Sequence, residues 1–184
     1  MKKNLLVLLV AVFVVAGTMV AIKARAAAIQ HSANGQGTFL ADDGNGGTTR
    51  RTFSFSARIG DDGTVSGNAV LHTNAFTYGK GNQPYAVQID ISCMKVVGNT
   101  AYFGGMPRKT NEPDPVYSDA VYFIAQDNGE PGKGRDKISY AYFYDFDPAI
   151  TGDPQLCQGL PDTSPGGLND SALVTIDQGN VQVR

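Results

Sequence analysis

Residues 51–59 read Arg-Thr-Phe-Ser-Phe-Ser-Ala-Arg-Ile, and this stretch decides the fold class because apolar and polar residues alternate along it. Successive side chains of a β-strand point to opposite faces, so the alternation is typical of a strand buried on one side. The same period of two recurs in residues 64–73, 85–97 and 136–145. We therefore expect one core to bury the apolar positions of these strands, namely Phe53, Phe55, Val65, Leu71, Val87, Ile89, Ile91 and Ile138.

Shorter apolar runs complete the expected sheet, and clusters of Gly, Asp and Asn separate them. The dipeptides Asp62-Gly63 and Gly98-Asn99 are typical of tight hairpins, because their residues tolerate a positive φ. Many short strands without helices between them predict antiparallel pairing, and hence an all-β fold that is a β-sandwich or a partly closed β-barrel. The additional strands are expected at 37–41, 100–106, 120–126, 172–176 and 180–183.

The first 26 residues predict a secretory signal peptide. A basic start, Lys2-Lys3, precedes an apolar run over residues 5–22, and Ala24-Arg25-Ala26 supplies a cleavage site. The alternative is an uncleaved anchor, because this run approaches the ~20 residues that span a bilayer. We expect cleavage, with residues 27–184 as a single secreted β domain. The domain would be extracellular, on the cell surface or, in a Gram-negative cell, in the periplasm, and without membrane attachment.

Cleavage would make the chain more acidic. The precursor has a net charge of −2, and removing the leader leaves 11 basic against 17 acidic residues, a net charge of −6. An acidic chain without a basic cluster repels phosphate backbones. We therefore expect no nucleic-acid partner.

Cys93 and Cys157 predict a disulfide, since an even pair of cysteines in an exported chain meets an oxidising compartment. A metal-binding or redox pair would need closer spacing, and two free thiols are the alternative. Long proline-rich loops are expected at 107–118 and 146–170. The bond would tie the second loop, which contains Cys157, to the inward face of strand 85–97, which carries Cys93.

Several segments resemble a family of small secreted bacterial β domains of unassigned function. Residues 91–105, Ile-Ser-Cys-Met-Lys-Val-Val-Gly-Asn-Thr-Ala-Tyr-Phe-Gly-Gly, resemble its cysteine-bearing strand, Gly-Asn turn and return to Gly-Gly. Residues 126–132 and 136–139 are similar to its Asp-Asn-Gly-Glu-Pro-Gly turn with the following strand, and residues 178–183 to its last strand. The resemblance implies a secreted or cell-surface domain of a kind found beside repeats or carbohydrate-active modules.

No recognisable catalytic site stands out, and we expect a non-catalytic protein. His31 follows the leader in an expected loose segment, His72 ends a strand, and there is no Gly-x-Ser-x-Gly nucleophile elbow. Asp90 is expected on a solvated outer face. With the cysteines paired, too few ligands remain for zinc.

Calcium is the one metal for which the sequence offers candidate ligands, because several turns are rich in side-chain oxygens. Asp127, Asn128 and Glu130 form one such turn, but it lacks the spacing of a twelve-residue calcium loop. Asp and Asn are also favoured in turns because they bond the backbone. We expect structural turns and no cofactor, with calcium at these three residues as the alternative. Two further clusters with the same character are Asp42, Asp43 and Asn45, and Asp145, Asp147 and Asp153.

Tyr140, Tyr142 and Tyr144 are expected on one strand face with Ile138, as part of the core; an exposed row would instead stack on sugar rings. We predict a binding or structural role, with an extracellular glycan or another surface molecule as the candidate partner. One alternative is an extracellular hydrolase acting on polysaccharide, with two carboxylates facing across a cleft. Another is a lipocalin-like carrier with a small apolar ligand in an aromatic-lined interior.

Overall fold

The protein is described here by a computed structural model that covers residues 29–42, 46–73, 85–110, 119–144, 152–165 and 167–184. The expected signal peptide, residues 1–26, lies outside the described residues, as do residues 111–118 of the first long loop. Within the described ranges, no helix is long and apolar enough to cross a membrane.

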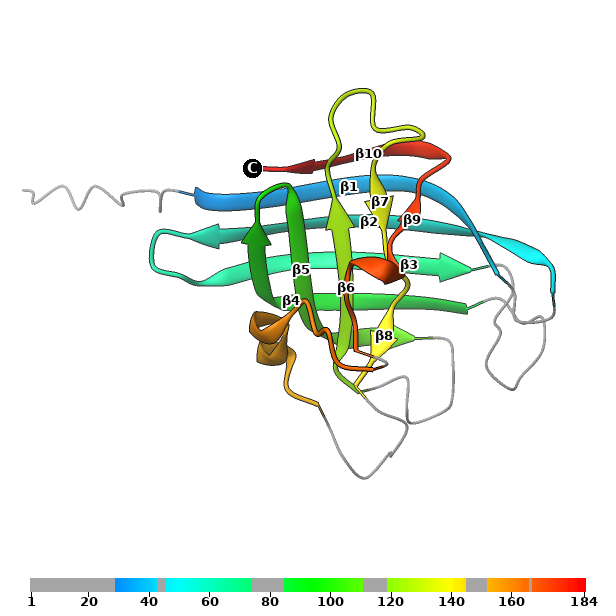
Figure 1. Ribbon diagram of the computed structural model, residues 1–184. Helices are drawn as coiled ribbons and strands as arrows, with labels where there is room; N and C mark the ends of the chain where they lie inside the picture. The colour runs from blue at the N-terminus through cyan, green and yellow to red at the C-terminus, as the bar shows by residue number, and fades with distance from the viewer. Residues whose placement is uncertain (1–28, 43–45, 74–84, 111–118, 145–151, 166) are drawn as a thin grey trace, which may run out of the picture.

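The described chain forms one antiparallel sheet (Figure 1), with strands in the order β10-β1-β2-β3-β4-β5-β6-β7-β9 and β8 beside β6. Of the two 3-10 helices, η2 (Pro154–Gly159) lies in the second long loop, and η3 (Asp170–Ala172) starts at the last residue of that loop. The strands are β1 (Ile29–Asp42), β2 (Thr48–Gly60), β3 (Val65–Thr73), β4 (Tyr85–Val97), β5 (Thr100–Thr110), β6 (Val121–Gln126), β7 (Lys137–Ile138), β8 (Tyr142–Phe143), β9 (Val174–Thr175) and β10 (Gln178–Val183).

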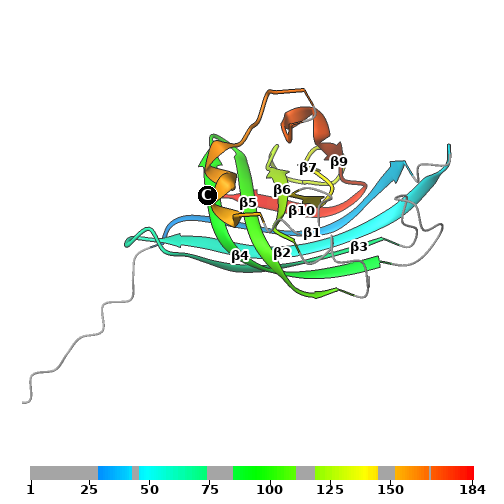
Figure 2. The same cartoon turned by 90° about the horizontal axis from the view of Figure 1, so that it is seen from below.

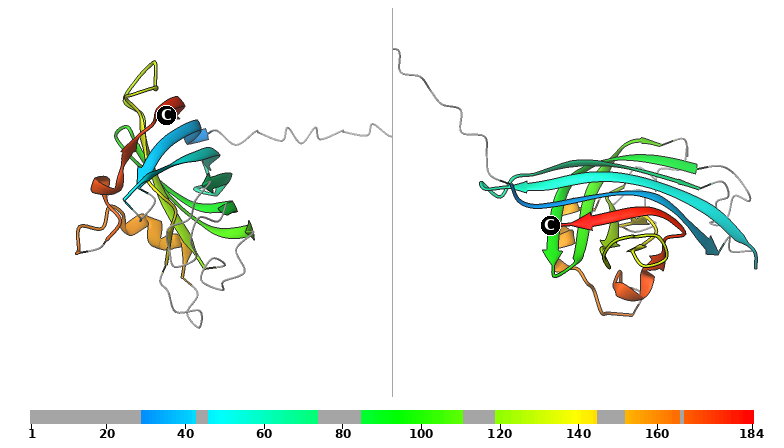
Figure 3. Two further views of the ribbon diagram at one scale, coloured as in Figure 1. Left: turned by 90° about the vertical axis from the view of Figure 1, so that its right-hand side faces the viewer. Right: turned by 90° about the horizontal axis from the view of Figure 1, so that it is seen from above.

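The sheet curls on itself into a half-barrel. Figures 2 and 3 show β1 to β4 as long curved strands, with β6, β7 and β10 on the concave side of the curl. The all-β prediction is confirmed, and of the two expected architectures the partly closed barrel is the one observed. Both predicted hairpins are present, and Gly63 and Gly98 have φ angles of 78° and 60° in their turns.

A β-bulge in β4 changes which residues face the core. Ile91 pairs with Gly105 and Cys93 with Gly104, so Ser92 is an extra residue without a partner of its own. A bulge bends a strand and increases its twist, and Figure 1 shows β4 turning from the direction of β3 to that of β5. The prediction that Cys93 shares the inward face is wrong, because after the bulge Cys93 lies in a separate outer cluster.

Phenylalanine side chains fill the inside of the curl. Phe103 and Phe123 stack with ring centroids 4.4 Å apart, and Phe55 approaches both rings from β2. Offset and edge-to-face contacts of this kind add to the stabilisation from area burial. The predicted core is confirmed, except that Val65 is half-buried and only packs against it; the buried positions are Phe53, Phe55, Leu71, Val87, Ile89, Ile91 and Ile138.

The single strand expected at 136–145 is instead broken into β7 and β8. At the break, the Ser139 hydroxyl accepts a hydrogen bond from the Ile124 N–H, in place of a backbone carbonyl. The tyrosines therefore do not share one face, and that prediction is wrong. Tyr140 packs against the main core, Tyr142 packs against the outer cluster, and Tyr144 is 42% exposed.

Strand β10 has two different neighbours. One edge pairs with β1, from Thr38↔Gln178 to Ala33↔Val183. On the other edge the buried carboxylate of Asp136 accepts hydrogen bonds from Val181 N, at 2.7 Å, and from Asn128 N, at 2.8 Å. Asp136 thus joins β10 to the turn between β6 and β7, and closes the seam where the two ends of the curled sheet meet.

We expect Asp136→Ala to lower the free energy of unfolding by about 2–5 kcal/mol, because two buried backbone N–H groups lose their acceptor. Asp136→Asn should give a smaller loss, since the amide keeps one carbonyl oxygen but turns a donor toward the other N–H. Guanidinium unfolding curves would measure both effects.

Asp90→Ala is the matched control. Asp90 is exposed on β4 and lies 3.5 Å from Arg108, a surface pair whose loss should change stability by no more than about 1 kcal/mol. Equal losses for Asp136→Ala and Asp90→Ala would contradict the role assigned to Asp136.

Candidate functional site

The calcium candidates form a turn held by hydrogen bonds within the protein. Both oxygens of Asp127 accept from backbone N–H groups, those of Gly129 at 2.9 Å and Val183 at 3.1 Å. The Asn128 amide donates to the Arg135 carbonyl at 2.8 Å. Gly129 has a φ of 89°, the left-handed conformation that glycine allows at a tight turn. These contacts account for the polar residues of the turn without a metal.

Glu130 faces β10 from the same turn. Its Oε1 accepts from Asn180 Nδ2 at 2.8 Å and from Gln182 Nε2 at 3.0 Å. The hydrogen bond from Gln182, followed by that from Asn180, lowers the pKa of the carboxyl group below its usual value. Glu130 therefore adds a second, exposed contact between the turn and β10.

The other oxygen-rich clusters are described only in part. Asp153 caps η2, where its Oδ1 accepts from Gln155 N at 2.9 Å, and Asp42 ends β1. Within the described ranges no three His, Cys, Asp or Glu side chains lie close enough together to hold a metal ion. The remaining candidates, Asp43, Asn45, Asp145 and Asp147, lie outside the described residues.

The two histidines lie on β1 and β3, which are separated by β2, and they are near opposite ends of β2. His31 is paired with Ile59 near the start of β1, so its expected loose segment is instead a strand, while His72 is opposite Thr52 near the end of β3. The structure does not bring them together. Asp90 lies on the outer face, as expected, beside Arg108.

The disulfide fastens η2 to the outside of the sheet. Cys93 and Cys157 are bonded, as predicted, with their Cα atoms 6.1 Å apart, and both are fully buried. Lys95 reinforces the attachment, because its Nζ donates to the carbonyls of Gln158 and Leu160. A Cβ on Gly104 would lie 2.1 Å from the Pro154 carbonyl, so only glycine lets η2 approach β5 this closely.

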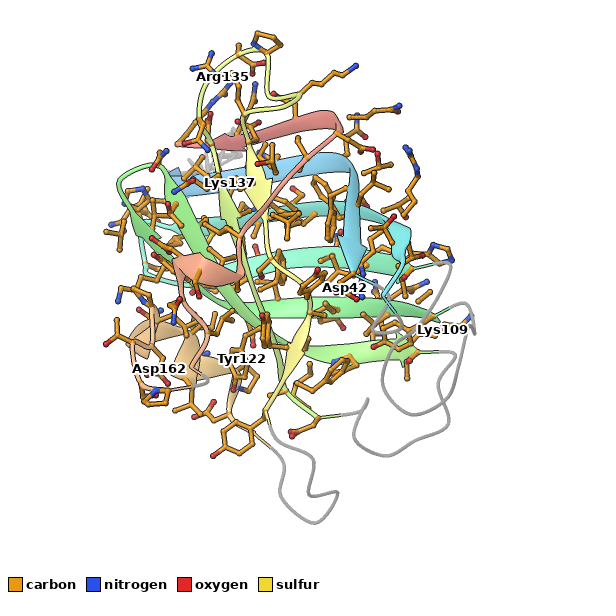
Figure 4. The ribbon with its side chains drawn as sticks, turned by 45° about the vertical axis from the view of Figure 1, so that its right-hand side comes forward. Asp42, Lys109, Tyr122, Arg135, Lys137 and Asp162 are labelled. Atoms are coloured by element: carbon orange, nitrogen blue, oxygen red, sulfur yellow. A yellow bond between two sulfur atoms is a disulfide. The ribbon has the colours of Figure 1, made fainter. Side chains whose placement is uncertain are left out.

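A cleft of about 410 Å³ opens beside this fastened segment, between it and β6 and β8. We call it the tyrosine cleft. Its volume is within the range of small-molecule sites, about 300–1,000 Å³. Figure 4 shows two of its residues, Tyr122 and Asp162, at the same corner of the molecule. The lining residues that matter below are Tyr122, Tyr142, Tyr144, Leu156, Leu160 and Asp162.

The floor of the tyrosine cleft is apolar and fixed. Tyr122 is 8% exposed, and its hydroxyl donates to the Asp153 carbonyl at 2.7 Å. Burial, followed by the charges of Asp119 and Asp153, raises the pKa of Tyr122 to about 12, so the phenol stays neutral. Leu160 is also nearly buried in the outer cluster.

The rim of the tyrosine cleft is amphipathic. Tyr144 and Leu156 are 42% and 49% exposed, so two of the five exposed large hydrophobic side chains among the described residues line this cleft. The Asp162 carboxylate accepts from Ser164 Oγ at 2.6 Å and from Ser164 N at 2.9 Å. The side-chain bond, then the backbone bond, lowers the pKa of Asp162, so a charged acceptor lines the same cleft as the exposed ring of Tyr144.

The sequence did not identify this site. Tyr122, Leu156 and Asp162 lie on β6 and in the second long loop, and nothing local in the sequence brings those segments together. The available signal was Cys157, whose bond places the loop on the sheet. Asp162 is the one acidic side chain among the described residues that line the tyrosine cleft, so this cleft does not present the two facing carboxylates that a polysaccharide hydrolase would need. The hydrolase alternative stays a prediction.

The interior of the half-barrel offers little space for a ligand. Phenylalanines fill it, and the cavity at its end, beside Arg51 and Tyr140, measures about 30 Å³. This volume has room for about two water molecules. A lipocalin-like carrier would be favoured by an empty, aromatic-lined interior, and the described core residues do not enclose one.

We expect millimolar calcium to leave the melting temperature unchanged, because protein donors already bond the oxygens of the 127–130 turn. Asp127→Ala should lower the melting temperature equally with and without calcium, as the Gly129 and Val183 N–H groups lose their acceptor. Differential scanning calorimetry would measure this. A calcium-dependent rise that Asp127→Ala abolishes would show that the turn is an ion site.

Reduction of the disulfide should lower the free energy of unfolding by about 4 kcal/mol, the chain-entropy value for a loop of 64 residues. Guanidinium unfolding with and without a phosphine reductant would measure the loss, with thiol titration to prove that the bond is broken. An unchanged midpoint in the fully reduced protein would contradict the fastening role of the bond.

The chain matches no protein-family model, no curated protein and no solved structure. The resemblance to small secreted bacterial β domains therefore stays a prediction from the sequence.

Proposed function

We propose that the protein is a non-catalytic, exported domain that binds an extracellular carbohydrate in the tyrosine cleft. The observation that carries the proposal is the combination, at one rim, of an exposed tyrosine ring with a charged carboxylate acceptor. The leader-like N-terminus and the disulfide support export, because disulfides persist in oxidising compartments.

Sugar rings need two kinds of contact, and the tyrosine cleft supplies both. The C–H face of a pyranose packs on an aromatic ring, whose amphipathic edge also tolerates water. The exposed ring of Tyr144 and the half-buried ring of Tyr142 provide such surfaces. Sugar hydroxyls are donors, and the ionised carboxylate of Asp162 is an acceptor-only group. An apolar ligand would make no use of that charge.

The fastened walls favour binding without a large rearrangement. Tyr122 is held by its hydrogen bond to Asp153, and η2 by the disulfide and Lys95. A site whose side chains are already ordered loses less conformational entropy when a ligand binds. The cleft therefore suits a soluble oligosaccharide or the end of a polysaccharide chain.

A glycan array probed with residues 27–184 would identify the ligand, and isothermal titration calorimetry with the best oligosaccharide would give its affinity. We expect Tyr144→Ala to weaken binding by about 5–30-fold, as for an aromatic anchor residue. Tyr144→Phe should bind almost normally, because the ring and not the hydroxyl makes the stacking contact.

Leu40→Ala serves as the control, since Leu40 is a comparably exposed apolar residue, 48%, on β1. It should leave the affinity unchanged. No binding to any glycan, or binding that Tyr144→Ala leaves intact, would overturn the proposal. Mass spectrometry of the bound oligosaccharide after long incubation separates binding from hydrolysis, and we expect to recover it uncleaved.

A further inference from the structure

The charges at the tyrosine cleft are of one sign. Asp162 is the one charged side chain among its described lining residues, none of which is Lys, Arg or His. Two further carboxylates, Asp119 and Asp153, lie close enough to Tyr122 at the floor of the cleft for their charges to help raise its pKa. A ligand in the cleft is therefore surrounded by carboxylates.

Two cations act near the walls of the cleft, but neither is one of its lining residues. Lys95 has its Nζ bonded to two backbone carbonyls of the second long loop, at 3.0 and 2.6 Å. Burial and then Tyr140 raise the pKa of Tyr142, and Arg51 opposes that shift only in part. The potential inside the cleft is therefore negative, which favours a cationic ligand and disfavours an anionic one.

The Asp162 carboxylate has one oxygen open to a ligand. Both hydrogen bonds from Ser164 go to Oδ1, and no described residue donates to Oδ2. The loop around it is fixed, because Asp162 N donates to the Leu168 carbonyl and Gly167 N to the Ser164 carbonyl. A Cβ on Gly167 would lie 2.7 Å from Oδ2, so the glycine leaves room beside this oxygen.

An ammonium group suits this place better than a hydroxyl group does. Its hydrogen bond to a carboxylate is charge-assisted, and hence stronger than the bond from a neutral donor. An ammonium is also attracted to the face of an aromatic ring, and the rings of Tyr142 and Tyr144 line the same cleft. A carboxylate on the ligand would instead be repelled by Asp162.

We infer that the ligand of the tyrosine cleft is an amino sugar with a free, protonated amine, which donates to Oδ2 of Asp162. The inference rests on the proposed carbohydrate binding and names the class of glycan: cationic glycans are preferred to neutral ones, and neutral ones to acidic ones. Asp162 determines this preference, whereas the ring of Tyr144 supplies a stacking contact that all three classes can make.

Isothermal titration calorimetry at about pH 6 tests the preference with β-1,4-linked tetramers of glucosamine, glucose and glucuronic acid. We expect the glucosamine tetramer to bind at least about tenfold more tightly than the glucose tetramer, because it gains a charge-assisted bond. The glucuronic acid tetramer should bind most weakly. Added salt should reduce the preference by screening. At about pH 9, where a sugar amine is largely neutral, the preference should disappear.

The variant Asp162→Asn should remove the preference, so that the glucosamine and glucose tetramers bind with equal affinity. The loop should stay folded, because the amide oxygen still accepts from Ser164. Asp62→Asn is the matched control. Asp62 lies in a similar turn between β2 and β3, where its Oδ1 accepts from Thr64 N at 2.8 Å, and it does not line the cleft. Its loss removes the same charge and should leave the preference intact.

The inference is overturned if the glucose or glucuronic acid tetramer binds as tightly as the glucosamine tetramer, or if the glycan array returns only glycans without a free amine. It is equally overturned if Asp162→Asn keeps the preference, or if Asp62→Asn reduces it as much. In each of these cases a glycan still binds and Tyr144→Ala still weakens it, so the proposed function stands. Absence of binding to any glycan overturns both.

Discussion

The hydrogen bonds from Val181 N and Asn128 N to the Asp136 carboxylate are the contacts on which the closed form of the sheet depends. Strand β10 pairs with β1 on one edge, but no described strand pairs with its other edge. Such an edge presents a row of unpaired N–H groups. Asp136 accepts from Val181 N on that edge, and Asp127, from the turn after β6, accepts from Val183 N two residues further along β10. The two carboxylates thus accept the hydrogen bonds that a neighbouring strand would otherwise accept, and the sheet stays curled without a continuous ladder of backbone hydrogen bonds around the barrel.

Sequence patterns predicted the strands well wherever one face is apolar and the pairing is regular. Strand β4 begins and ends where expected, and β2 and β3 differ from expectation by a few residues at most. Strand β1 is much longer than the expected 37–41. The prediction was too short because the first half of the strand is mostly polar and contains Gly35. A Cβ at Gly35 would lie 2.4 Å from the Phe55 ring, so only glycine leaves room for that ring. The same glycine weakens the strand pattern in the sequence.

The errors in facing direction have one common cause. The period of two fixes only whether neighbouring residues share a face, and one extra or unpaired residue reverses everything after it. Ser92 does this in β4 and moves Cys93 to the outer cluster, while the break at Ser139 separates Tyr140 from Tyr142. Which residue is unpaired depends on the partner strand, so it cannot be read locally. The tyrosine cleft depends on both reversals, because they place Cys93 and Tyr142 on the outer side of the sheet. The disulfide could be predicted from the pair of cysteines alone, whereas the cleft could not be predicted without knowing the two reversals.

The pairing of β1 with β10 also sets the order in which the chain can fold. Ala33 and Val183 are partners across 150 positions of sequence, whereas β2–β3 and β4–β5 are joined by short hairpins. Contacts between residues so distant in sequence form late, because the loop-closure entropy must be overcome first. Until residues 178–183 have been synthesised, β1 can pair only with β2, and Asp136 has no β10 strand to bond. If the chain is exported, as proposed, and crosses the membrane unfolded, the pairing of β1 with β10 would form only after residues 178–183 had crossed the membrane.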